Sequence, residues 1–349
     1  MIETPRRISV LVVDDSALMR KMIGEIIEQD PSLQLAGTAR NGQEALDQIR
    51  ALRPDVVTLD IEMPVMDGLQ ALARYMADAP TATVMLSAHA KEGAEATLLA
   101  LELGAVDFIT KPSGSISLDI DRVRADLVGK IKVAAGVDLA KLRSGGQRLA
   151  PQPLASPHVP GRAVTLVAIG SSTGGTRALS DVLPSLPAEL GAAYLLVQHM
   201  PLGFTRSLAE RLNARSKITV KEAEHGDPVR QGQALLAPAG YHLELDASGQ
   251  RVSLNQNPTK FGVRPSVDIM MQSVAARAAQ PLVGVILTGM GHDGAQGMLE
   301  IRQRGGRTIA EDKSTCVVYG MPKSAIEAGA VEQVLPLDRI PEAIIKACE

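Results

Sequence analysis

The sequence predicts two α/β domains, each built on a mainly parallel β-sheet. Short apolar runs with the length of strands alternate, in both halves of the chain, with segments whose apolar residues repeat at helical spacing. Four early runs end on polar or charged residues, as strands of an open parallel sheet do where their carboxyl ends form a crevice. Between the halves, glycines and prolines interrupt a polar stretch, which is typical of a linker.

The first half contains five strand-like runs. They cover residues 8–13, 33–39, 55–59, 83–86 and 106–110. After the first run, Leu18, Met22 and Ile26 recur at helical spacing. Five β/α units predict a doubly wound sheet, and for this size we expect the flavodoxin-like strand order. We expect this domain to span residues 1–133, with a flexible linker over 134–161.

The second half, from residue 162 to 349, resumes the alternation. Strand-like runs cover residues 165–170, 194–200, 234–238, 282–289 and 308–312, with a hairpin pair at 242–246 and 251–255. Helical segments begin near residue 176 and cover 205–212, 266–279, 294–304 and 341–348. We therefore expect a second doubly wound, mainly parallel α/β domain.

Composition narrows the class of protein. The net charge is −3 with 21% charged residues, which does not indicate a nucleic-acid partner. The N-terminal apolar run is short and meets two aspartates, unlike a signal peptide, and no apolar stretch approaches the ~20 residues of a membrane span. Cys316 and Cys348 lack metal-ligand spacing, so we interpret them as reduced packing residues. We expect a cytoplasmic protein that does not insert into a membrane.

Five polar residues at successive strand ends predict a phosphoryl-accepting site in the first domain. The pair Asp14 and Asp15 can hold a divalent ion such as Mg²⁺, with Asp60 as third ligand and phosphoacceptor. Ser87 would bond a phosphoryl oxygen, and Lys111 would pair with the phosphate. A lone aspartate at a strand end often only caps a helix, and a lone lysine is usually solvated, but five such residues together favour a site.

The same residues lie in segments that resemble the receiver domain of a two-component response regulator. The similarity covers about residues 8–130, in LVVDDSALMR, PDVVTLDIEMPVMDG and GAVDFITKP. It implies that Asp60 is phosphorylated and that Asp14 and Asp15 bind the metal, Mg²⁺. It also implies that Ser87 and Lys111 are the switch residues.

A glycine-rich turn opens the second domain. Residues 170–174, Gly-Ser-Ser-Thr-Gly, fit the G-x-S-x-G form in which a serine lies on a sharp strand-to-helix turn, with Ser172 at its centre and Ser171 beside it. The helix N-terminus and the Thr173 backbone N–H could stabilise an oxyanion. The motif alone fits a nucleophile and an anion cradle equally well.

A nucleophilic serine needs a base, and the base needs an orienting acid. Two histidines follow apolar strands, His199 and His292. We favour His199, because His292 directly precedes Asp293 and could not easily aim both ring nitrogens. Asp293 then becomes the orienting carboxylate, although it could also be only a helix cap. The order Ser, His, Asp differs from that of the α/β-hydrolases, and the absence of HExxH or HxH disfavours a zinc hydrolase.

The full arrangement resembles the chemotaxis protein-glutamate methylesterases, the CheB family. The similar segments are AIGSSTGG, LLVQHMPLGFTRSLAERLN, LAPAGYHLEL, RPSVD, ILTGMGHDGAQGM and YGMPKSAIEAGA. The resemblance implies the triad Ser172, His199 and Asp293, and an oxyanion hole that includes the Met290 backbone N–H. Two departures are Ser171, where alanine is frequent, and His292, where asparagine or arginine is frequent.

This resemblance also implies a function. It implies hydrolysis of glutamate γ-methyl esters on methyl-accepting chemotaxis receptors, with release of methanol and with deamidation of receptor glutamines as a second reaction. No cofactor is expected in the esterase site. A chemotaxis histidine kinase would supply the phosphoryl group, and the unphosphorylated receiver would hinder substrate access. The alternative is a response regulator that acts by phosphorylation-dependent binding, with a degenerate catalytic half.

Overall fold

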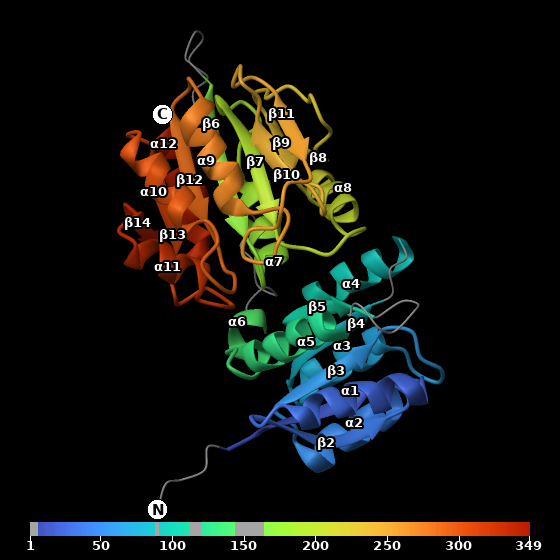
Figure 1. Ribbon diagram of the computed structural model, residues 1–349. Coiled ribbons are helices and arrows are strands. Elements are labelled where there is room, and N and C mark those ends of the chain that lie inside the picture. The colour runs from blue at the N-terminus through green and yellow to red at the C-terminus, as the bar shows by residue number, and fades with distance from the viewer. Residues whose placement is uncertain (1–5, 88–90, 112–119, 144–163) are drawn as a thin grey trace, which may run out of the picture. The chain divides into compact units, whose positions relative to one another are not determined.

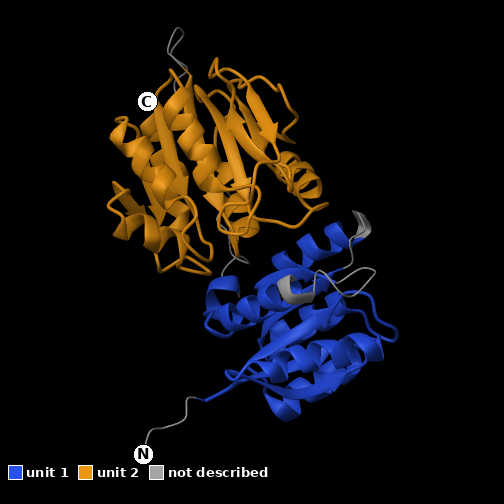
Figure 2. Cartoon of the chain, in the orientation of Figure 1, with its two compact units in different colours: residues 1–146 blue, residues 147–349 orange. Residues whose placement is uncertain are grey.

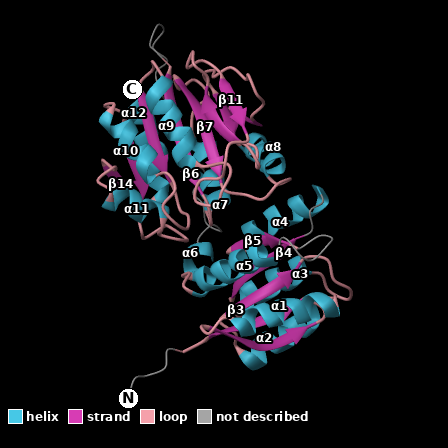
Figure 3. Ribbon diagram, in the orientation of Figure 1, coloured by secondary structure: helices cyan, strands magenta, loops and turns pink. Residues whose placement is uncertain are grey.

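The computed structural model describes residues 6–87, 91–111, 120–143 and 164–349. The chain divides into two compact units, residues 1–146 and 147–349 (Figure 2). In each unit, strands alternate with helices, as Figure 3 shows by colour. Among the described residues, no helix combines the length and the apolar character that crossing a membrane requires.

The first unit is a five-stranded parallel sheet in the order β2-β1-β3-β4-β5, which confirms the flavodoxin-like prediction (Figure 1). Its strands are β1 (Ile8–Val13), β2 (Leu33–Ala39), β3 (Val56–Asp60), β4 (Ala82–Ser87) and β5 (Asp107–Thr110). Its helices are α1 (Ala17–Gln29), α2 (Gly42–Leu52), α3 (Gly68–Asp78), α4 (Lys91–Leu103), α5 (Ile120–Ala135) and α6 (Leu139–Arg143). The strand ends reach one edge because all five strands run in the same direction.

The start of the predicted linker is helical. Helix α5 continues to Ala135, and α6 lies within residues 134–161 that the sequence assigned to the linker. The reason is burial: Ile131, Ala134 and Leu142 are all buried and extend an apolar face past the glycine at position 136. The rest of the predicted linker, 144–161, lies outside the described residues.

The second unit is a seven-stranded parallel sheet in the order β14-β13-β12-β6-β7-β9-β8, with a separate antiparallel hairpin β10-β11. Its strands are β6 (Thr165–Ser171), β7 (Ala192–Gln198), β8 (Thr219–Glu222), β9 (Gln233–Leu236), β10 (His242–Leu245), β11 (Val252–Asn255), β12 (Leu282–Ile286), β13 (Arg307–Glu311) and β14 (Gln333–Leu335). Its helices are α7 (Gly175–Val182), α8 (Thr205–Arg215), α9 (Val267–Arg277), α10 (Ala295–Gln303), α11 (Met321–Glu327) and α12 (Ile340–Cys348), with short 3-10 turns η2 (Leu183–Ser185) and η3 (Leu337–Arg339).

One hydrophobic core joins this sheet to α9 and α10. Met270, Met271 and Val274 of α9 and Met298 and Ile301 of α10 are fully buried against the central strands. This packing fixes the N-terminus of α9 near the carboxyl ends of β6 and β12. Gly170 permits the approach, because a Cβ atom there would lie 2.2 Å from Val267 Cγ1.

Candidate functional site

Three carboxylates gather at one edge of the sheet of the first unit. Strands β1 and β3 pair in register up to Val13 and Leu59, so Asp14 and Asp60 follow side by side. Both are buried, whereas Asp15 is exposed, and one oxygen from each of the three lies within 4.8 Å of the others. Three acidic oxygens at this distance are a suitable donor set for a hard divalent cation such as Mg²⁺.

Lys111, which follows β5, joins this acid cluster. Its Nζ lies 2.8 Å from Asp14 Oδ2 and 2.6 Å from Asp60 Oδ2. Burial raises the pKa of Asp60 to about 6; the Lys111 ammonium opposes the shift and the Asp14 charge adds to it. Lys111 supplies one positive charge to three clustered carboxyl groups, so the residues fit an additional bound divalent cation.

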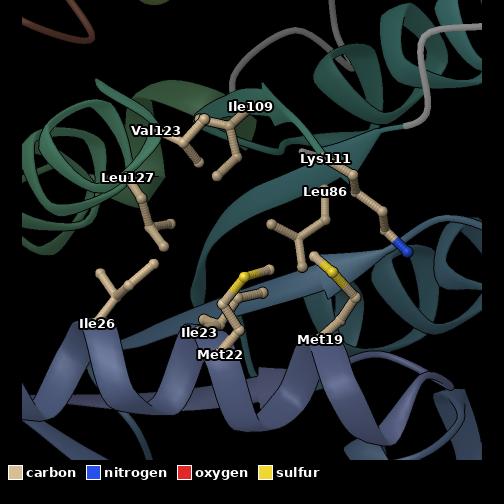
Figure 4. A pocket seen from close by; sticks show the side chains of 9 residues that line it. All are labelled: Met19, Met22, Ile23, Ile26, Leu86, Ile109, Lys111, Val123 and Leu127. Atoms are coloured by element: carbon tan, nitrogen blue, oxygen red, sulfur yellow. The ribbon is translucent and has the colours of Figure 1, made fainter. Parts of the chain in front are cut away.

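The stem of Lys111 lies beside a small apolar cavity between α1 and α5. Met19, Met22 and Ile26 of α1 line it together with Leu127 of α5 (Figure 4). In Figure 4 the Lys111 ammonium points away from Ile26 and Leu127. The aliphatic stem thus packs on apolar side chains while the charged end remains with the acids.

Ser87 ends β4 at the same edge, and its hydroxyl forms hydrogen bonds with α4. Its hydroxyl accepts a hydrogen bond from Thr97 Oγ1 (2.7 Å) and donates weakly to the Gly93 carbonyl oxygen (3.4 Å). The structure therefore brings Asp14, Asp15, Asp60 and Lys111 together. Contact of Ser87 with a phosphoryl group requires its hydroxyl to exchange these partners.

The second candidate site is built on the turn between β6 and α7. Ser172 is half-buried, and its backbone N–H donates to the Thr288 carbonyl oxygen at 3.0 Å. Ser171 is fully buried and donates its hydroxyl to Gln198 Oε1 at 2.7 Å. This bond removes Ser171 as a competing nucleophile, so the first departure from the family pattern leaves Ser172 as the accessible hydroxyl of the pair.

His199 lies beside this turn because β6 and β7 are neighbouring parallel strands. Their register pairs Ser171 with Gln198, the last residue of each strand, so Ser172 and His199 directly follow the two strand ends. His199 Nε2 lies 2.9 Å from Asp293 Oδ2. Since a carboxylate only accepts, Nε2 carries the hydrogen, and Nδ1 is the ring nitrogen left to act as a base.

Asp293 is buried at the N-terminus of α9. Its carboxylate accepts hydrogen bonds from the backbone N–H groups of Val267 (2.7 Å) and Asp268 (2.9 Å) and from the Ser266 hydroxyl (2.8 Å). Burial alone would raise the pKa of Asp293, but the hydrogen bond to His199 and those from the helix N–H groups outweigh it and lower the pKa. The residue is thus held as an oriented anion next to the imidazole.

His292, the other histidine considered, is exposed and has different neighbours. Its ring packs edge-on against Phe261, with centroids 4.2 Å apart. Asp293 forms its hydrogen bond with His199 instead, which supports the choice of His199 made from the sequence.

The two backbone N–H groups predicted for an oxyanion hole lie on segments that touch. A Cβ atom at Gly289 would lie 2.8 Å from Ser172 Cβ, so the loop that carries Met290 packs directly on the serine turn. Thr288 Oγ1 donates to the Thr173 carbonyl oxygen at 3.0 Å and holds the Thr173–Gly174 peptide, the second one after Ser172. The Met290 side chain is half exposed.

Sequence reasoning missed two buried polar residues that support this turn. Gln198 Nε2 donates to the carbonyl oxygens of Ser172 and His199, both at 2.9 Å. Glu311 Oε2 accepts the Thr288 backbone N–H at 2.8 Å, and burial raises the pKa of Glu311 to about 7. A polar residue at the end of each apolar strand was the available signal.

Fold and sites define the class of this protein: a receiver domain joined to a hydrolase-type α/β domain with a Ser, His and Asp constellation. Residues 10–120 match the model of the response regulator receiver domain, and residues 167–344 match the model of the CheB methylesterase. The chain belongs to the CheB methylesterase family, and it carries that family's receiver domain.

Full-length relatives agree with this assignment. The protein-glutamate methylesterase/protein-glutamine glutaminase of Symbiobacterium thermophilum is 54% identical, over 98% of this chain and 97% of its own. The protein of the same name from Pyrococcus abyssi is 50% identical, over 99% of this chain and 95% of its own. The solved catalytic domain of Thermotoga maritima CheB methylesterase is 47% identical with a TM-score of 0.51, covering 54% of this chain and 99% of that one.

Proposed function

We propose that this chain is a phosphorylation-activated protein-glutamate methylesterase and protein-glutamine glutaminase. It removes γ-methyl esters from glutamates of methyl-accepting chemotaxis receptors, releases methanol, and converts receptor glutamines to glutamates. The observation that carries the proposal is the 2.9 Å contact of His199 Nε2 with buried Asp293, next to the Ser172 turn. The names of the full-length relatives support both reactions, on glutamates and glutamines of a protein substrate.

Ester cleavage follows from the roles of three side chains. Ser172 Oγ attacks the ester carbonyl while His199 Nδ1 takes its proton, and Asp293 stabilises the imidazolium. The Thr173 and Met290 backbone N–H groups stabilise the tetrahedral oxyanion. The C–O bond to the methoxy group then breaks, and His199 returns the proton so that methanol leaves. Water hydrolyses the acyl-enzyme by the same steps and restores Ser172.

The amide reaction uses the same groups. A γ-carboxamide gives the same tetrahedral oxyanion, but its nitrogen must be protonated to leave as ammonia. Deamidation therefore depends more strongly on His199 as an acid. Receptor glutamines should gain one dalton after incubation with the enzyme, measured by mass spectrometry.

In the receiver, Asp14, Asp15 and Asp60 would hold Mg²⁺, which neutralises charge during phosphoryl transfer. Asp60 accepts the phosphoryl group from a chemotaxis histidine kinase in the cytoplasm. Lys111 then exchanges its contacts with the free carboxylates for the phosphate, and Ser87 exchanges Thr97 for a phosphoryl oxygen. We assign residues 1–133 to the receiver, whose last long helix α5 continues to Ala135, and residues 162–349 to the esterase domain.

Methanol release from methylated receptor membranes tests the function. Ser172→Ala should lose several orders of magnitude in rate. Ser171→Ala is the matched control: it removes the neighbouring hydroxyl, which is buried and bonded to Gln198, and should retain most activity. Substantial methanol release by Ser172→Ala would contradict the assignment, and no release by the wild-type protein would favour a binding protein without catalysis.

A further inference from the structure

Phe261 adopts a backbone conformation that a bulky side chain normally avoids. It has a φ of 54° and is followed by Gly262 with a φ of 78°. The flanking residues Lys260 and Val263 exchange two backbone hydrogen bonds, of 3.2 and 3.0 Å, so Phe261 and Gly262 form a two-residue turn. Asparagine, aspartate or glycine usually fills the first such position, because a large residue is strained there.

Burial does not compensate for this strain. The Phe261 side chain is 52% exposed, so the residue contributes little to the core. A strained residue that persists without a packing role points to a function.

The ring lies beside the segment that carries the triad acid. It packs edge-on against His292, which is exposed and adjoins Asp293 in the chain. Met290, whose backbone N–H is assigned to the oxyanion hole, precedes His292 by two residues. Phe261 and His292 together therefore present an aromatic surface next to the triad.

The turn shares its support with the triad acid. Lys260 Nζ lies 3.1 Å from Asp268 Oδ2 and donates to Gln272 Oε1 at 3.3 Å, and both partners belong to α9. The same helix holds Asp293 through the backbone N–H groups of its first turn. The aromatic surface is thus fixed relative to the reacting groups.

We propose that Phe261 and His292 form a wall of the substrate cleft that binds the polypeptide flanking the ester-bearing glutamate. This inference rests on the proposed function. A glutamyl side chain places its ester only a few bonds from the main chain, so the substrate backbone must pass close to the rim of the site. An exposed aromatic ring there gives contact area to aliphatic side chains and peptide groups at low entropic cost.

The test compares a protein substrate with a small one, using the full-length enzyme under constant phosphodonor conditions. The substrates are a methylated receptor and the N-acetyl, N-methylamide derivative of glutamate γ-methyl ester. Phe261→Gly should raise KM on the receptor about tenfold with little change in kcat, and leave kcat/KM on the small ester unchanged. Because glycine suits the positive φ, the variant should unfold at the same or higher denaturant concentration.

Two further variants sharpen the result. Phe261→Tyr keeps the ring and should retain receptor activity. Val334→Ala truncates another exposed apolar residue, on the edge strand β14. It should leave kcat and KM unchanged on both substrates. Equal loss on both substrates would assign Phe261 to triad geometry, and a gain on the small ester would assign it to contact with the receiver. Either result, or an unchanged receptor KM, overturns the proposal, whereas an inactive wild-type enzyme would instead overturn the proposed function.

Discussion

At the scale of single residues, Gln198 is the side chain that joins the two halves of the predicted catalytic machinery. It binds the carbonyl oxygens of Ser172 and His199 and also accepts from Ser171. The polar residue at the end of an apolar strand was a signal in the sequence, but the partners of Gln198 are defined only when β6 and β7 become neighbours. The three triad residues could be proposed from sequence motifs, whereas the hydrogen bonds that hold them in place could not.

Gln198→Ala should therefore reduce kcat more than it changes KM. Loss of the two donated hydrogen bonds lets Ser172 and His199 drift apart, and a displacement of about 1 Å can cost on the order of 100-fold in rate. Methanol release under saturating receptor measures kcat. Gln231→Ala, the same truncation at an exposed glutamine of the same unit, should leave kcat unchanged. A normal kcat in Gln198→Ala would show that the strand ends hold their positions without it.

Glu311 predicts a pH dependence of stability. Its pKa is raised by burial to about 7 in the folded protein, so the folded state binds a proton more tightly than the unfolded state, where the pKa is near 4.5. Stability from this residue is therefore present below pH 4.5 and is lost as the pH rises toward 7. Glutamine cannot ionise, so Glu311→Gln should remove that loss in the free energy of unfolding, which is roughly 3 kcal/mol at pH 8.

Urea unfolding of wild type and Glu311→Gln at pH 5 and pH 8 measures this effect. The variant should gain stability relative to wild type at pH 8 and little at pH 5. If the unfolding free energies of variant and wild type differed by the same amount at both pH values, Glu311 would stay in one protonation state.

At the scale of elements, the sequence located the strands of the first unit to within one residue at either end. Apolar runs and the polar residues at their ends are signals in the local sequence, so these strands can be located without knowing which strands pair. In the second unit, β8, β14 and α11 were not predicted. Strands β8 and β14 are short edge strands with polar residues, and α11 has only seven residues, so neither carries a clear periodicity.

Close packing between elements yields a prediction at Gly289. A methyl group there would lie 2.8 Å from Ser172 Cβ and 2.3 Å from Met321 Sδ. Gly289→Ala should displace the loop that carries Met290 and lower kcat by at least about tenfold. The control is Gly191→Ala, which adds the same methyl group just before β7, where no heavy atom beyond the adjacent residues lies within 4 Å. Equal activity of the two variants would show that the loop tolerates the displacement.

At the scale of the whole molecule, phosphorylation would change which charged groups Lys111 of the receiver contacts. Lys111 is shared between Asp14 and Asp60, and Ser87 is held by Thr97 on α4. A phosphoryl group on Asp60 supplies acceptor oxygens for both residues, so the contacts of β4 and β5 with their surroundings would change together. The relation between this change and esterase activity follows from the family resemblance, not from any local feature.

If the unphosphorylated receiver hinders substrate access, separating the two domains should release the esterase. A fragment of residues 162–349 should hydrolyse methylated receptor faster than the unphosphorylated full-length chain at equal concentration. Asp60→Asn should fold, fail to take up phosphate from a small phosphodonor, and remain at the low basal rate. Lys111→Ala should accept phosphate but activate poorly, because the lysine that couples the phosphate to the strand edge is missing. Inhibition by the receiver is excluded if the fragment is no faster than the unphosphorylated full-length protein, since removal of an inhibitor must raise the rate.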